Sequence, residues 1–137
     1  MKKKINLFIL IFYFGFTKVQ AGDIVIIGNS NVPKMDLVTI QKIYTGKIVS
    51  VSEINVKPVN AKLGSTERNR FLENVMNQDE EKYTGYWTVR RYIGKGTPPN
   101  ELNSSAEIID YVKSTAGAIG YIDESELKTG MNVIGRK

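Results

Sequence analysis

The chain has 137 residues, a length that suits one domain whose core needs no covalent cross-links. It contains no cysteine and no histidine, which excludes disulfides, zinc ribbons, iron–sulfur sites and catalysis by a thiolate or an imidazole. Its 19 basic and 14 acidic residues give a net charge of +5, an excess that can indicate a nucleic-acid or membrane partner.

The first 21 residues have the pattern of an export signal. Three lysines follow the initiator methionine, and residues 5–16 form an apolar run that is too short to span a bilayer comfortably. Ala21 is the small residue that a signal peptidase accepts before its cut. We therefore expect a signal peptide over residues 1–21 and an exported, periplasmic domain over residues 22–137, which meets the membrane only before cleavage. The alternative is an uncleaved anchor.

This leader also carries most of the positive charge. It holds four lysines and no acid, so the remaining 116 residues carry 15 basic and 14 acidic side chains, a net charge of +1. Affinity for nucleic acid depends on many Lys and Arg contacts to phosphates. We therefore expect no nucleic-acid partner.

The rest of the chain alternates strand-like and helix-like segments. Strands are expected where β-branched residues gather, at residues 23–28, 54–59, 118–122 and, as a short final strand, 132–134. Four helices are expected from apolar residues at helical spacing, beginning at Asp36, after residues 64–66, at Asp79, and at Ser104 or Ser105. Residues 94–99 form a loop. This order predicts an α/β domain with a mixed central sheet flanked by helices.

The best candidate ligand site is the start of the second helix. Free backbone N–H groups at a helix N-terminus, together with the hydroxyls of Ser65 and Thr66, suit a small oxyanion. Gly64 would let the backbone approach closely, and Arg68 is placed to turn its guanidinium toward a phosphate or carboxylate. The alternative is structural: Ser65 or Thr66 caps the helix, and Gly64 makes the turn.

Three further clusters also have two interpretations. A basic group at the end of the third helix either faces an acidic ligand or is solvated and favoured by the helix dipole: Arg90, Arg91 and Lys95. An aromatic group either stacks a sugar or base or packs in the core: Tyr83, Tyr86 and Trp87. An acidic group either acts as general acid and base or forms a turn: Asp123, Glu124 and Glu126. No partner for acid–base chemistry stands out, so we expect no enzyme, no metal and no cofactor.

Several segments carry a pattern in their order and spacing. They are residues 36–48 with the motif IYTGKI, residues 56–60, residues 64–66 before Phe71-Leu72, Tyr86-Trp87, residues 94–96, and residues 117–121 with the motif GAIGY. This series resembles the phosphate-binding proteins of phosphate ABC transporters, within the type II periplasmic-binding-protein superfamily.

The resemblance implies one lobe of such a protein, with phosphate held at the helix start by Gly64, Ser65 and Thr66. Full-length members have two lobes, and the length here suits one. Their loop usually reads Gly-Ser-Gly-Thr after an arginine, whereas this chain has Glu67 close to the expected anion and Asn60-Ala61 in place of the arginine. Arg68 is the residue that could compensate for that negative charge.

We therefore expect an exported, solute-binding-like protein that binds phosphate or another small oxyanion weakly and that works with an ABC permease. An open half-site cannot keep the anion from water, which limits its affinity. The alternative is a periplasmic interaction or sensory module, whose exposed ligand-facing surface docks another envelope protein or forms a homodimer.

Overall fold

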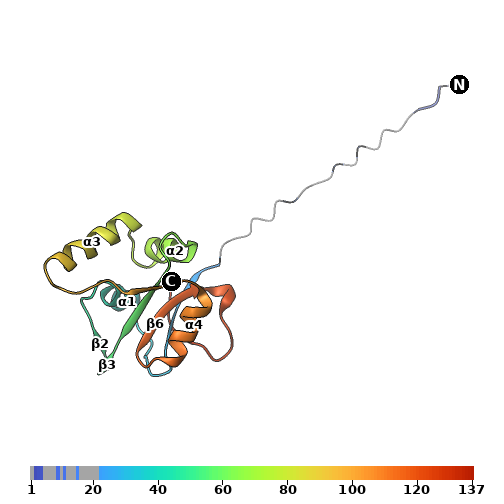
Figure 1. The fold of residues 1–137 in the computed structure, drawn as a ribbon. Coiled ribbons are helices and arrows are strands. Elements are labelled where there is room, and N and C mark those ends of the chain that lie inside the picture. Colours follow the sequence, from blue (N-terminus) through green and yellow to red (C-terminus); the bar gives the residue numbers. More distant parts are fainter. Residues whose placement is uncertain (1, 5–8, 10, 12–14, 16–21) are drawn as a thin grey trace.

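The structure is a computed structural model that describes residues 2–4, 9, 11, 15 and 22–137 (Figure 1). Most of the expected signal peptide, including the cut after Ala21, lies outside the described residues. Within the described part, no helix has the length and apolar character needed to cross a membrane.

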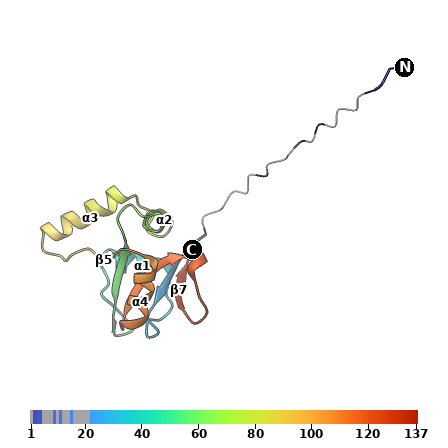
Figure 2. The ribbon, with the colours of Figure 1, turned by 45° about the vertical axis from the view of Figure 1, so that its right-hand side comes forward.

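Residues 22–137 alternate between strands and helices, as the sequence predicts (Figures 1 and 2). In chain order the elements are β1 (Ile24–Gly28), α1 (Leu37–Tyr44), β2 (Ser50–Val51), β3 (Ile54–Asn55), β4 (Lys57–Ala61), α2 (Thr66–Asn74), α3 (Glu80–Tyr92), β5 (Asn100–Leu102), α4 (Ser105–Ser114), β6 (Ala118–Asp123), the 3₁₀ turn η1 (Glu124–Glu126) and β7 (Asn132–Arg136).

Five strands form one mixed sheet in the order β5-β4-β6-β1-β7. Strand β4 runs parallel to both β5 and β6, while β1 runs antiparallel to β6 and to β7. All five residues of β1 are buried, as a strand covered on both faces requires. The prediction of an α/β domain with a mixed central sheet is therefore confirmed.

The helices cover both faces of this sheet. On one face, Gly120 of β6 leaves room for Ile108 and Val112 of α4, so close that an added Cβ would lie 2.6 Å from the Ile108 side chain. On the other face, Tyr121 stacks on Phe71 of α2 at 3.9 Å between ring centroids, with Tyr44 of α1 beside them. Helix α3 extends beyond the sheet next to α2 in both ribbon views (Figures 1 and 2).

The helix starts follow the sequence closely. Asp36, Ser65, Asp79 and Ser104 are the N-caps of α1, α2, α3 and α4, and each side chain accepts a hydrogen bond from the backbone N–H three residues later. Such caps stabilise a helix by about 1 kcal/mol each. The predicted helix starts are confirmed.

The segment expected as one strand over residues 54–59 is divided. Ile54–Asn55 pairs with Ser50–Val51 in a separate hairpin, and only Lys57–Ala61 joins the main sheet. The hairpin turns through Ser52 and Glu53, whose φ angles are +48° and +65°. Two residues with positive φ suit a tight hairpin turn, but such residues are usually Asn and Gly. Ser52 and Glu53 therefore do not predict this turn from the sequence.

Candidate functional site

The start of α2 is the site that the sequence singles out. Ser65 has extended backbone angles, and its Oγ accepts a hydrogen bond from the Arg68 N–H at 3.3 Å. The Ser65 N–H donates to the Lys62 carbonyl at 3.0 Å, so both groups serve the cap itself. The structural interpretation of Ser65 as the N-cap is therefore confirmed.

Gly64 and Thr66 lie on either side of this cap and are both exposed. Gly64 has a φ of +83°, and no other atom lies within 4 Å of the position that a Cβ would take. The N–H groups of Thr66 and Glu67 belong to the first turn, where a helix supplies no acceptor. The open donors at this helix start are thus these two N–H groups and the Thr66 hydroxyl.

Arg68 points into the body of the protein. Only 6% of the residue is exposed, and its guanidinium binds both oxygens of Glu80, with Nε to Oε1 at 2.7 Å and Nη2 to Oε2 at 3.2 Å. Nη1 lies 2.6 Å from Oε1 of Glu101. Arg68 therefore joins α2, α3 and β5, and its guanidinium is already shared by two carboxylates.

These partners of Arg68 could not be found from the sequence, because they lie 12 and 33 residues away. The sequence analysis gave neither Glu80 nor Glu101 a role at this site. The available signal was Arg68 itself, a charged residue one turn into an amphipathic helix. That signal does not distinguish a ligand from a carboxylate of the protein as the partner.

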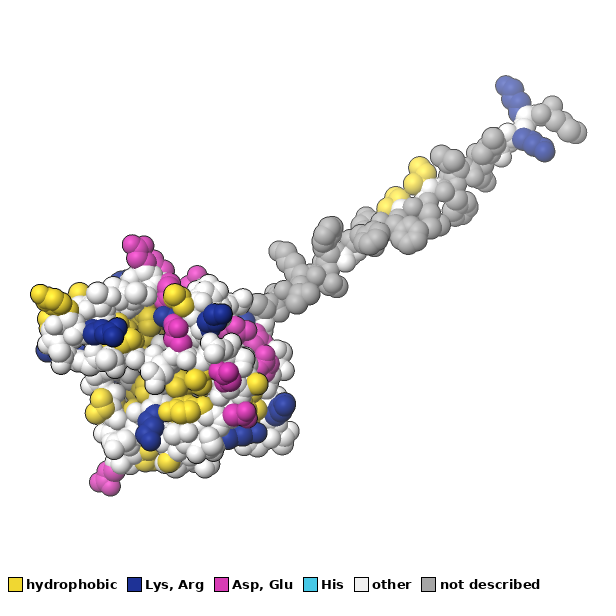
Figure 3. Space-filling model, viewed as in Figure 1, with side chains coloured by type: hydrophobic (Ala, Val, Ile, Leu, Met, Phe, Trp, Pro, Cys, Tyr) yellow, Lys and Arg dark blue, Asp and Glu magenta, His cyan; other side chains and the backbone are white. Residues whose placement is uncertain are grey.

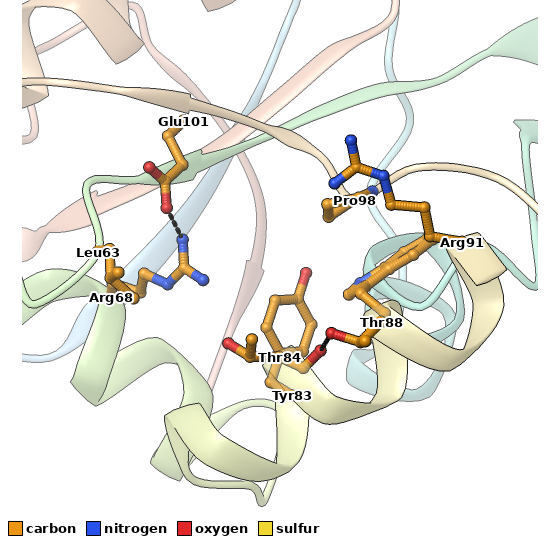
Figure 4. A pocket seen from close by; sticks show the side chains of 9 residues that line it. Leu63, Arg68, Tyr83, Thr84, Thr88, Arg91, Pro98 and Glu101 are labelled. Carbon is orange, nitrogen blue, oxygen red and sulfur yellow. Dashed lines mark hydrogen bonds and ion pairs between the residues drawn. The ribbon is translucent and has the colours of Figure 1, made fainter.

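A cavity of about 230 Å³ adjoins this ion-pair cluster (Figure 4). The side chains of Tyr83 and Trp87 form an aromatic side of it, and Arg68 and Glu101 form a charged side. Thr88 lies along α3 and donates a hydrogen bond to the Thr84 carbonyl at 2.9 Å. The cavity therefore lies between α2, α3 and β5, beside the helix start rather than on it.

The charge around the helix start is mixed. Glu67 lies in the first turn of α2. Its carboxylate interacts favourably with the positive end of the helix dipole, but it repels an incoming anion. Arg68 is outnumbered by the two carboxylates that it binds. An oxyanion at the Thr66 N–H would therefore gain from the backbone and little from side-chain charge.

The aromatic cluster of α3 is mainly core. Tyr83 and Trp87 are buried, and the hydroxyl of Tyr86 donates to the Thr45 carbonyl at 2.7 Å. Arg90 stacks over the rings of Tyr86 and Trp87 at 5.6 and 5.7 Å and donates to the Gly46 carbonyl. The structural interpretation of the aromatic group is thus confirmed, and Arg90 is packed against it.

Two of the three residues in the acidic group at the end of β6, Asp123 and Glu124, are held in ion pairs. Asp123 binds Arg70 at 2.6 Å and accepts from the Ser125 N–H at 2.8 Å, and these hydrogen bonds lower the pKa of the Asp123 carboxyl to about 2. Glu124 binds Arg136. A carboxyl that stays ionised in this way is a poor general acid near neutral pH. Among the described residues, no group of acidic side chains is arranged to hold a metal ion.

Three solved structures share this architecture over 82% of the chain. A putative phosphate ABC transporter substrate-binding protein with bound phosphate from Clostridium perfringens matches with 27% identity and a TM-score of 0.63 over 44% of its own length. An ABC-type phosphate transport receptor from Vibrio cholerae matches with 15% identity and a TM-score of 0.56 over 45% of its length. PstS from Borrelia burgdorferi matches with 15% identity and a TM-score of 0.60 over 46% of its length.

No protein-family model matches the sequence, and no curated protein matches it significantly. The fold is that of one lobe of a periplasmic-binding protein, with its five-stranded mixed sheet between helices. More particularly, the chain resembles a single lobe of phosphate ABC transporter substrate-binding proteins, and it spans less than half the length of those that it matches.

Proposed function

We propose that this chain is an exported, single-lobe, solute-binding protein that binds phosphate or another small oxyanion weakly at the start of α2, and that it has no catalytic role. The observation that carries the proposal is the open helix start at Gly64–Glu67, in a lobe matched at 27% identity by a protein described with bound phosphate. Helix N-termini bind anions through free N–H groups and the helix dipole.

The four candidate residues have different roles in this proposal. Gly64 leaves the approach open, and Ser65 fixes the helix start through its cap. Thr66 offers its N–H and hydroxyl to the anion, while Arg68, whose charge is already shared by Glu80 and Glu101, holds α2 in place and makes no direct contact with the anion. An anion at an exposed helix end gains only about 0.3–1 kcal/mol per contact, so we expect a dissociation constant in the millimolar range or weaker.

An NMR titration tests this proposal. We expect phosphate added to ¹⁵N-labelled protein at constant ionic strength to shift the amide signals of Gly64, Thr66 and Glu67. The start of α4 is a matched internal control, since it is also capped by serine and exposed, but has no preceding glycine. Equal shifts at Ser105 and at Thr66, the first residues after the two serine caps, would mean that phosphate binds any helix end, which would overturn the proposed site.

A second candidate function is an interaction module, either a homodimer or a lobe that docks an ABC permease or another envelope protein. It is favoured by exposed apolar side chains on the last turn of α3 and beside the cavity: Leu63, Val89, Tyr92 and Ile93. Figure 3 shows hydrophobic side chains in the hollow under α3 and at its outer end. Tyr92 is 92% exposed, an unusual position for a large ring.

Sedimentation tests the homodimer form of this second function. A homodimer predicts about twice the monomer mass for the wild type and a return to monomer in a Tyr92→Ser, Ile93→Ser double variant. The same variant should leave the phosphate-induced shifts at Thr66 unchanged, because the two regions do not share residues. A monomer at all concentrations would exclude the homodimer and leave the docking of another protein to be tested by cross-linking in cells.

A further inference from the structure

Gly22, the first residue of the expected mature chain, lies against the side chain of Asp123. A Cβ placed on Gly22 would lie 2.9 Å from Oδ1 of Asp123 and 3.5 Å from Oδ2. Since a carbon–carbon bond adds about 1.5 Å, the Gly22 Cα itself lies within about 4.5 Å of Oδ1. The backbone at position 22 is therefore in direct reach of a carboxylate.

The two oxygens of this carboxylate have different partners. Oδ2 receives the Arg70 guanidinium at 2.6 Å, while Oδ1, the oxygen nearer to Gly22, accepts a hydrogen bond from the Ser125 backbone N–H at 2.8 Å. The Asp123 side chain is 15% exposed, so water screens it only in part. A carboxylate oxygen can accept more than one hydrogen bond, so Oδ1 has capacity for a cation.

Cleavage would create such a cation in this place. Hydrolysis of the Ala21–Gly22 peptide bond consumes one water and leaves a carboxylate on Ala21 and an amino group on Gly22. With an ordinary pKa of about 7.7–8.0, that amino group is mostly protonated at neutral pH. Because Gly22 has no side chain, its ammonium can turn about ψ toward Oδ1 without displacing the carboxylate.

We propose that removal of the leader stabilises the domain by placing the Gly22 ammonium in an ion pair with Asp123, opposite Arg70. This inference rests on the proposed export and cleavage after Ala21. Cleavage one residue earlier or later would put the ammonium elsewhere, so the proposed pair depends on a cut at this bond. Processing would thus complete a three-membered ion cluster and fix the start of β1 against the end of β6.

The charged side chains near the proposed pair include Arg70, Asp23, Glu124, Arg136 and Lys137, the last of which lines a cavity together with Asp23. Arg70 opposes the ammonium, and Asp23, next in the chain, favours it. Glu124 and Arg136 bind each other, so they contribute little net charge. Arg70 and Lys137 oppose the ammonium, so its binding here depends on direct contact with Asp123.

The test compares two forms of residues 22–137, which contain every described helix and strand and the whole described core. One form has a free Gly22 amine, and the other is acetylated there. We expect acetylation to lower the Tm by about 2–5 °C, the shift that a partly screened ion pair gives in a domain of this size. We expect no such difference in the Asp123→Asn background, whereas Asp110→Asn, an exposed acid on α4, should retain it.

A direct reading comes from the unmutated protein. We expect NMR titration to give the Gly22 amine a pKa above 8.0, since a nearby carboxylate favours the ammonium. Equal Tm values for the free and acetylated forms, or an amine pKa of 8.0 or below, would overturn the ion pair. Intact mass of the exported protein is a separate measurement: a mature chain that begins elsewhere would refute the cleavage site, whatever the purified domain shows.

Discussion

The indole Nε1 of Trp87 donates a hydrogen bond at 3.2 Å to the carbonyl oxygen of Tyr44, a residue 43 positions earlier in the chain. The Tyr83 hydroxyl donates to the same oxygen at 3.1 Å. This carbonyl ends α1, where a helix leaves its own acceptors unpaired. Two side chains of α3 therefore supply the hydrogen bonds that the last carbonyl of α1 lacks. These bonds explain how a helix that lies beyond the sheet is fixed to the lobe.

The same hydroxyl continues a buried network toward the sheet. Asn60 donates to the Tyr83 hydroxyl at 3.2 Å, and the Tyr121 hydroxyl donates to Oδ1 of Asn60 at 3.1 Å. Burial raises the pKa of Tyr44, Tyr83 and Tyr121 above the ordinary tyrosine value, so all three keep their protons near neutral pH. The network is therefore a neutral connection between α1, α3, β4 and β6.

Removal of one hydroxyl should weaken this connection. Tyr83→Phe leaves the ring in place but takes a partner from Asn60 and from the Tyr44 carbonyl, so we expect a loss of about 1–3 kcal/mol in the free energy of unfolding. Urea unfolding measures it. Tyr92→Phe is the control, because that ring is exposed and should change stability by less than about 0.5 kcal/mol. Equal effects of the two variants would contradict the network.

Arg68 should matter more for stability than for ligand binding. Arg68→Met leaves Glu80 and Glu101 without their shared cation, and loss of one partner of a buried ion pair costs about 3–5 kcal/mol. Because Glu80 and Glu101 are partly exposed, we expect about 2–3 kcal/mol in urea unfolding. Arg91→Met, an exposed neighbour at the same cavity, should cost under about 0.5 kcal/mol. A fully stable Arg68→Met protein would show that the ion pairs contribute nothing.

Two glycines with similar backbone angles should respond very differently to alanine. Gly64 and Gly117 have φ angles of +83° and +79°, so each substitution costs about 1–2 kcal/mol from the backbone alone. At Gly117 a Cβ would also lie 2.0 Å from the Asn55 carbonyl oxygen, whereas the space at Gly64 is open. We expect Gly117→Ala to be largely unfolded at 37 °C by circular dichroism and Gly64→Ala to remain folded. Comparable Tm values would refute this difference.

Stability should fall in acid through Asp123. The folded-state pKa of about 2 lies below the ordinary value of 3.8, so ionised Asp123 contributes stability above pH 4, and this contribution disappears as the pH falls toward 2. With an allowance for partial exposure, we expect the loss to be about 1 kcal/mol. Urea unfolding at pH 5 and at pH 2.5 measures it. Arg70→Met should remove most of the dependence, and an unchanged pH profile in that variant would contradict the assignment.

The parts of the fold that depend on local chemistry could be predicted from the sequence. Asp36, Ser65, Asp79 and Ser104 mark helix starts because a cap needs only a side-chain oxygen and the next three residues. The resemblance also anticipated a single lobe, which the solved structures support over 82% of the chain. Both predictions, the helix starts and the single lobe, depend on patterns of residues that are close together in the sequence.

The parts that depend on distant residues were not accessible. Strand β5 has three mostly exposed residues and exists because it pairs with β4, some 40 positions earlier. Arg68 has the same charge whether it faces a ligand or a carboxylate, and only the folded chain brings Glu80 and Glu101 to it. At the start of α2, the sequence therefore predicted the donors but not how many of them the protein itself uses.

The pairing of β1 with β7 determines how the chain of this lobe can be re-engineered. Val25 lies opposite Arg136 in the register, so the described domain begins and ends at the same end of two neighbouring strands (Figure 1). A linker of a few residues would join the two ends. The exposed loop over residues 94–97 is a suitable place to open the chain and create new termini. The lobe should therefore tolerate circular permutation, and it can be inserted into a loop of another protein as a closed unit.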